Sequence, residues 1–159
     1  MKKLILILAM ACAALVSCNK DDAETSIRQE ALLENLQGKW SCIEVDTYLS
    51  EEAYKNGNRT GHIDCEEGGY EALVFDGEKI FTGDDEDGVL TLGKNPFEIE
   101  SNDGKKIVTK PMPGDEDGTV YYVIRYLGDE KVQSVKRIST DKCVHVLTYI
   151  RTDREIVFM

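Results

Sequence analysis

Hydrophobic and polar positions divide the chain into an apolar leader, a short helical pattern and a long region of alternating runs. Apolar residues at nearly helical spacing precede Gly38: Ile27, Ala31, Leu32, Leu33 and Leu36. Ser26, with Gln29 three residues later, resembles the capping box with which many helices begin. The pattern therefore predicts one short helix over residues 27–36.

From Lys39 onward the pattern changes to short β-rich runs separated by turn dipeptides, mainly Asn-Gly and Asp-Gly pairs. We expect about eight or nine strands from these runs: 39–48, 70–75, 79–82, 89–92, 97–100, 105–110, 119–127, 131–139 and 143–151, with an extra piece at 155–158. Consecutive runs of this kind predict an all-β fold, an antiparallel up-and-down meander preceded by the short helix.

The edges of such a meander decide between closed and open architectures. Residues 97–100 alternate between apolar and acidic, as expected where one face of a sheet meets water. Residues 120–126 are largely apolar on both faces, which indicates a strand that is covered on both sides. Because closure removes the edges altogether, we expect a barrel, and a two-sheet sandwich is the alternative.

The first 17 residues have the pattern of a signal peptide. Lys2 and Lys3 are followed by an apolar run that is too short for a membrane span, which takes roughly 20 residues. The run ends at Leu15-Val16-Ser17-Cys18. These four residues resemble the lipobox of bacterial lipoproteins, which implies that Cys18 is acylated, with palmitate for example, and becomes the mature N-terminus. An ordinary secretory signal is the alternative.

Residues 18–26 are charged and too polar to pack, which predicts a tether behind the anchor. Lys20, followed by acidic residues, resembles the surface-export sequence of outer-membrane lipoproteins in Bacteroides-like bacteria. The resemblance implies a protein of the cell envelope, lipid-anchored in the outer membrane and exposed at the surface. The expected division is a signal peptide over 1–17, a lipidated cysteine and polar tether over 18–26, and one domain over 27–159.

A Gly-x-Trp motif, Gly38 to Trp40, stands between the predicted helix and the first strand, and Arg151 ends the last long strand. Together these residues resemble the lipocalin-like families, in particular small lipocalin-like lipoproteins of gut bacteria. In those families the tryptophan plugs the closed end of a barrel and a basic residue stacks on it. The resemblance implies these structural roles for Gly38, Trp40 and Arg151. The chain lacks the Thr-Asp-Tyr motif of the families and has no room for their C-terminal helix.

Three cysteines remain beyond the leader and the anchor: Cys42, Cys65 and Cys143. An odd number in an oxidising compartment indicates one disulfide and one free thiol. If Trp40 lies opposite Arg151 in antiparallel strands, Cys42 and Cys143 are about 20 Å apart, too far for a disulfide. We therefore expect a Cys65–Cys143 disulfide, with Cys42 free and buried near Trp40.

Two further patterns resemble metal sites, and each has a simpler explanation. His62 and His145 flank Cys65 and Cys143 at spacings that zinc accepts, but the expected disulfide uses the sulfurs. The acidic runs 84–87 and 115–117 lack the ligand spacing of an EF-hand, so we expect solvated hairpin tips there, with weak calcium binding as the alternative. We predict no metal and no cofactor.

Composition narrows the function further. With 19 basic and 30 acidic residues the net charge is −11, which disfavours nucleic acid as a partner. The chain has no nucleophile motif, HExxH motif or phosphate-binding loop, so we do not expect an enzyme. The leading hypothesis is a small apolar or amphipathic ligand, bound by inward residues at the mouth of the barrel: Val120, Tyr122, Ile124 and Tyr126. The alternative is a non-enzymatic protein-interaction module, an accessory subunit of an envelope complex or an inhibitor, whose protein partner is unknown.

Overall fold

A computed structural model describes residues 20–65, 70–114 and 118–159. The described chain is mostly β, which confirms the predicted fold class. Its elements, in chain order, are α2 (Lys20–Leu36), β1 (Gly38–Tyr48), α3 (Glu51–Lys55), β2 (Gly61–Asp64), β3 (Glu71–Asp76), β4 (Lys79–Glu86), β5 (Val89–Leu92), β6 (Ile99–Asn102), β7 (Ile107–Thr109), β8 (Met112–Pro113), β9 (Thr119–Gly128), β10 (Lys131–Ile138), β11 (Val144–Arg151) and β12 (Glu155–Phe158).

The described strands form one sheet in the order β12-β5-β4-β3-β1-β11-β10-β9-β7-β6, with β2 paired to β1 and β8 paired to β9. All pairs are antiparallel except β12 and β5, which are parallel. Among these strands no ladder joins the two ends of the order into a closed barrel. One isolated antiparallel bridge, Ile80 to Phe97, connects β4 to the segment before β6.

The central pair of the sheet is β1 with β11, and its register is the one expected from the sequence at its first end. Trp40 lies opposite Arg151, and Cys42 lies opposite Tyr149. A bulge between Cys42 and Glu44 then shifts the register by one residue, so Tyr48 faces Val144. A bulge inserts one unpaired residue and increases the local twist of the strand.

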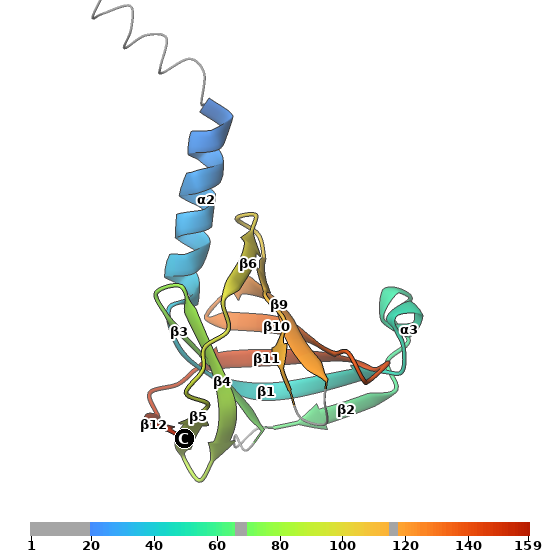
Figure 1. The fold of residues 1–159 in the computed structure, drawn as a ribbon. Coiled ribbons are helices and arrows are strands. Elements are labelled where there is room, and N and C mark those ends of the chain that lie inside the picture. Colours follow the sequence, from blue (N-terminus) through green and yellow to red (C-terminus); the bar gives the residue numbers. More distant parts are fainter. Residues whose placement is uncertain (1–19, 66–69, 115–117) are drawn as a thin grey trace, which may run out of the picture.

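Helix α2 begins at Lys20, seven residues earlier than the sequence pattern predicts. The expected tether is therefore helical from this point. Acidic residues in the first turn, Asp21 and Asp22, favour a helix start because they complement the positive end of the helix dipole. The C-terminal part of α2 packs on the sheet through the buried Leu32 and Leu36, whereas its first turns extend away from the β region (Figure 1).

The two faces of the sheet are covered in different ways. The inner face holds the largest buried cluster, which includes Trp40, Tyr122 and Tyr149. On the outer face, Ala72 and Val74 of β3 and two leucines of β5 pack with Ile156 of β12. Helix α3, which the sequence pattern did not reveal, covers another part of the outer face, where Arg137 donates two hydrogen bonds to Glu51.

The acidic run 84–87 is only partly a solvated hairpin tip, which corrects the sequence-based expectation. Asp85 is fully buried and accepts hydrogen bonds from the Ser41 hydroxyl and the Arg154 guanidinium. Its neighbour Asp84 is exposed. Because a buried charge must be paired to be tolerated, Asp85 joins β4, β1 and the segment before β12 into one unit.

Replacing Asp85 with Asn tests this buried ion pair. The substitution removes the buried carboxylate that pairs with the Arg154 guanidinium, and we expect the free energy of unfolding to fall by about 2–3 kcal/mol. Urea denaturation at pH 7 measures the change. Asp84→Asn is the matched control and is expected to alter stability by less than about 0.5 kcal/mol. Equal effects of the two substitutions would contradict the role given to Asp85.

Candidate functional site

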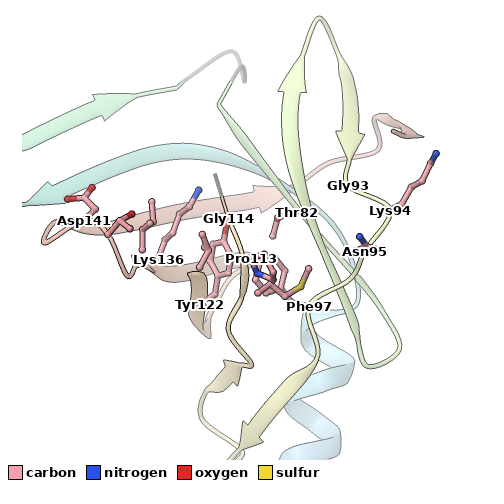
Figure 2. A pocket seen from close by; sticks show the side chains of 14 residues that line it. Thr82, Gly93, Lys94, Asn95, Phe97, Pro113, Gly114, Tyr122, Lys136 and Asp141 are labelled. Atoms are coloured by element: carbon pink, nitrogen blue, oxygen red, sulfur yellow. The ribbon is translucent and has the colours of Figure 1, made fainter. Parts of the chain in front are cut away.

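An open cavity of about 750 Å³ lies between two parts of the sheet. One wall comes from Thr82 of β4 and the connection from Gly93 to Phe97, and the other comes from β8, β9, β10 and the turn after β10 (Figure 2). These two walls are not neighbours in the strand order. The cavity therefore lies where the sheet is left open, beside the single Ile80–Phe97 bridge.

Apolar and aromatic side chains form much of the cavity surface: Phe97, Met112, Pro113, Val120, Tyr122 and Ile138. Phe97 and Tyr122 contact each other across the opening, with ring centroids 5.1 Å apart and the rings perpendicular. An edge-to-face pair of this kind stabilises the contact between walls that no strand ladder joins. The cavity thus has an apolar floor.

Two of the four residues expected to line a ligand site lie on this cavity, Val120 and Tyr122. Ile124 is fully buried in the inner core, and Tyr126 packs edge-to-face on Trp40 with centroids 6.4 Å apart. Alternate residues of β9 share one face, as expected, but this face runs from the cavity to the opposite end of the sheet. Position along the strand therefore separates cavity residues from core residues.

A polar network that the sequence pattern did not predict lies beside these apolar residues and reaches the cavity through Lys136. Lys136 donates a 2.7 Å hydrogen bond to the buried Glu71, and its ammonium nitrogen lies 5.7 Å from the centroid of the Tyr122 ring. Glu71 also accepts a 3.1 Å hydrogen bond from the Tyr149 hydroxyl, which lies 3.2 Å from the Ser134 hydroxyl. In the sequence, the signal for this network was the alternate placement of two polar residues, Ser134 and Lys136, on the same face of a strand as the apolar Val132.

The environment of Glu71 keeps the nearby phenols protonated. Burial, and then the charge and hydrogen bonding of Glu71, raise the pKa of Tyr122 well above its usual value. Burial and the charge of Glu71 raise the pKa of Tyr149 in the same direction. Lys136 balances the carboxylate and still has ammonium protons free for a further acceptor, because it carries three donors. The network can therefore bind a polar group at the inner side of the cavity.

The end of the sheet beside α2 holds the residues of the Gly-x-Trp motif. Trp40 is fully buried and donates a 2.8 Å hydrogen bond from Nε1 to the Leu36 carbonyl. The guanidinium carbon of Arg151 lies 4.3 Å from the centroid of the tryptophan ring. Gly38 has a φ of +110°, a backbone conformation that favours glycine. A Cβ added at this position would also lie only 2.9 Å from Nη1 of Arg151, so a larger residue would crowd the guanidinium.

Arg151 also caps the end of the helix. Its guanidinium donates hydrogen bonds to the carbonyls of Asn35 and Gln37, at 3.0 and 2.5 Å, and pairs with Glu130. Carbonyls at the C-terminal end of a helix lack partners within the helix and carry the negative end of its dipole. One cation therefore ties together α2, β11 and the turn between β9 and β10.

The cysteines are arranged differently from the expected pairing. Cys65 follows β2 and donates from its backbone nitrogen to Ile43, which places it next to Cys42. Cys143 precedes β11, whose first residue faces Tyr48 at the far end of β1. The structure therefore places Cys65 beside Cys42 and not beside Cys143, because the short strand β2 runs back along β1 toward Trp40. No pattern in the sequence indicated this strand.

The two histidines lie apart from any metal-like cluster. Nδ1 of His62 lies 2.7 Å from Asp46, and Nε2 of His145 lies 3.5 Å from Asp141. No group of three or more histidine, cysteine or acidic side chains suited to a metal ion occurs in the described ranges.

Several sequence-based predictions fall outside the described residues. These include the signal peptide over 1–17, the lipidated Cys18 and the second acidic run at 115–117. None of the helices within residues 20–65, 70–114 and 118–159 combines the length and the apolar character that crossing a membrane requires.

No family model, curated protein or solved structure matches this chain. The chemistry of its own residues therefore carries the functional assignment.

The raised pKa values of Tyr122 and Tyr149 predict how stability changes at alkaline pH. Below about pH 10 both phenols are neutral in the folded and unfolded states, so their contribution is fully present. As the pH rises above this value only the unfolded state loses these protons, and the free energy of unfolding falls. Absorbance of tyrosinate should show two phenols that ionise only with unfolding, and one in Tyr122→Phe or Tyr149→Phe. Ionisation of all tyrosine side chains in the folded protein would contradict this prediction.

Replacing Arg151 with Ala tests its contacts with Trp40 and with the end of α2. The variant loses the stacking on Trp40 and two hydrogen bonds to the helix end, so we expect unfolding to become easier by about 2 kcal/mol. Arg125, an exposed arginine of β9, provides the control, and Arg125→Ala should change stability by less than about 0.5 kcal/mol. Chemical denaturation of both variants gives the comparison, and similar stabilities would refute the capping role.

Proposed function

We propose that this protein is a lipid-anchored, lipocalin-like protein of the cell envelope that binds a small apolar or amphipathic molecule. The observation that carries the proposal is the open cavity of about 750 Å³ with its apolar floor. Pockets for small ligands usually measure about 300–1,000 Å³ and are lined mainly by apolar and aromatic groups with a few polar ones. The cavity agrees with that description in size, and its lining combines apolar and aromatic side chains with polar ones.

The lipocalin-like assignment is supported by two features of the sheet. The Gly-x-Trp motif lies at the end of α2 with Arg151 over the Trp40 ring, which is the arrangement that the resemblance implies. The Ile80–Phe97 bridge connects strands from distant parts of the sheet order and favours a sheet that curls toward closure. In this proposal the cavity is the mouth of an incompletely hydrogen-bonded barrel.

The walls of the cavity favour a ligand with two unlike ends. Phe97, Met112 and Tyr122 accept an apolar body. Lys136, which also lines the cavity, offers ammonium donors to a polar or anionic end. A fully apolar molecule would leave these donors without a partner and bind less tightly.

The position of α2 agrees with an anchor at Cys18. The helix begins two residues after this cysteine and ends beneath Trp40, so it forms a stalk about 25 Å long. The tip of the stalk would lie near the membrane and hold the domain at a distance from it. A lipid anchor with two or more acyl chains is stable, whereas a single chain binds only marginally.

Titration with fluorescent probes tests the binding function. We expect the purified protein to bind N-phenyl-1-naphthylamine or a dansyl-labelled undecanoic acid with a rise in fluorescence. Val120→Trp fills the cavity and should weaken binding at least tenfold, about 1.4 kcal/mol. Leu127→Trp, at an exposed site on the same strand, is the control and should bind as the wild type does. Absence of probe binding, or equal binding by Val120→Trp, would overturn the proposal.

A protein-interaction module is the second candidate. Its support is the edge strand β12, where Val157, Phe158 and Met159 expose about half or more of their surface. Exposed apolar side chains on a strand edge are common contact points for another protein. Native mass spectrometry of the protein from its own host separates the two candidates, because a retained small molecule supports the first and a retained protein supports the second.

A further inference from the structure

Two buried cysteines meet on the inner face of the sheet. Cys42 lies on β1 and is fully buried, and Cys65 follows β2 with 8% of its surface exposed. The backbone nitrogen of Cys65 donates a 2.7 Å hydrogen bond to the carbonyl of Ile43, the residue after Cys42. Both side chains belong to the same buried core cluster, and the Cys42 thiol donates a 3.3 Å hydrogen bond to the carbonyl of Glu44, the first residue of β1 that pairs with β2.

The local backbone explains why they meet. One edge of β1 pairs first with β3, up to Ser41, and then with β2, from Glu44 onward. Cys42 occupies the junction between these two partners, next to the bulge in β1. Cys65 comes directly after the last paired residue of β2, so the end of this strand delivers it to the same junction.

The surroundings of the pair do not suit nucleophilic or metal chemistry. Burial, followed by the neighbouring Cys65, raises the pKa of Cys42 to about 12, and burial with the charge of Asp64 raises the pKa of Cys65. Neutral thiols are poor nucleophiles and poor metal ligands. In the described residues no third ligand accompanies them.

We propose that Cys42 and Cys65 are a cross-linking site and form an intramolecular disulfide when the chain folds in an oxidising compartment. The oxidant is a disulfide, either a small one such as oxidised glutathione or that of a dithiol oxidase. The thiolate of one cysteine attacks the oxidant and releases one thiol. The second cysteine then displaces the remaining half as another thiol, so two S–H bonds are replaced by one S–S bond while the oxidant is reduced to two thiols.

The position of the cross-link gives it a structural consequence. The cross-link would join the end of β2 to β1. It would lie close to Glu71, because Ser41, the residue before Cys42, pairs with Ala72, the residue after Glu71. Closing the chain between residues 42 and 65 restricts the unfolded state, and we expect the melting temperature to rise by about 10 °C. The pair is buried, so oxidation takes place before β2 docks and is slow in the folded, reduced protein.

Peptide mapping tests the pairing directly. The full chain is refolded with oxidised glutathione, its free thiols are alkylated under denaturing conditions, and trypsin is added without reductant. Cys42, Cys65 and Cys143 then fall in separate peptides, over residues 40–55, 60–79 and 143–151, and the two remaining cysteines, Cys12 and Cys18, fall in the peptide over residues 4–20. We expect the first two joined, with the mass of two hydrogens missing, and Cys143 alkylated. A peptide over 60–79 joined to 143–151, or alkylation of both Cys42 and Cys65, would overturn the proposal.

Thermal unfolding of variants provides a second readout. Cys143→Ser should keep both the linked peptides and the drop in melting temperature that dithiothreitol causes in the wild type. Cys65→Ser should show no dithiothreitol effect. The wild-type peptide map decides the question even if a variant folds poorly. A Cys143→Ser protein that loses the dithiothreitol effect would show that Cys143 takes part in the cross-link, contrary to the proposal.

Discussion

The contact of Arg151 with Trp40 is the interaction on which the rest of the fold depends. Trp40 stands at the start of the first strand, and Arg151 stands at the end of the strand paired with it. The guanidinium covers the indole ring and at the same time satisfies carbonyls at the end of α2. One cation thus fixes the helix, both central strands and their register. Every residue along the inner face is placed relative to this point.

The inner face changes from apolar to polar with distance from Trp40. Around Trp40 lie leucine side chains of the core. Farther along the inner face lie Tyr149, Glu71 and Lys136. Burying a carboxylate costs free energy unless its partners are complete, and here an ammonium and a phenol supply them. Within the described residues every buried side-chain nitrogen or oxygen has a hydrogen-bond partner. A satisfied polar group therefore lies next to the apolar side chains of the cavity.

Local patterns predicted the strands well and the long-range contacts only in part. Alternation and turn dipeptides located β1, β5 and β12 within one residue at either end. The register of β1 against β11 followed from the assumption that Trp40 and Arg151 pair, and it held until the bulge before Glu44. Periodicity carries no information about a bulge. Nor does a four-residue edge strand such as β2 stand out in the sequence, and it is this strand that decides which cysteines meet.

The acidic run 84–87 led to a wrong prediction for a related reason. The run that contains Asp85 has the composition of a solvated turn, but strand alternation turns one of its carboxylates inward, toward Ser41 and Arg154. Composition describes a segment as a whole, whereas burial depends on which face of the strand a residue occupies. A basic residue far along the chain then supplied the partner, and no local window contains both.

The same part of the sheet explains why the cavity exists. Strand β5 returns along the free edge of β4 and pairs with it from Gly83 to Glu86, and β12 then pairs with β5. The edge of β4 is therefore occupied there, and β8 and β9 pair elsewhere. The Ile80–Phe97 bridge and the contact of Phe97 with Tyr122 span the opening. The hairpin that buries Asp85 outside the sheet thus leaves the gap inside it, and the open cavity is a consequence of how β4 finds its partners.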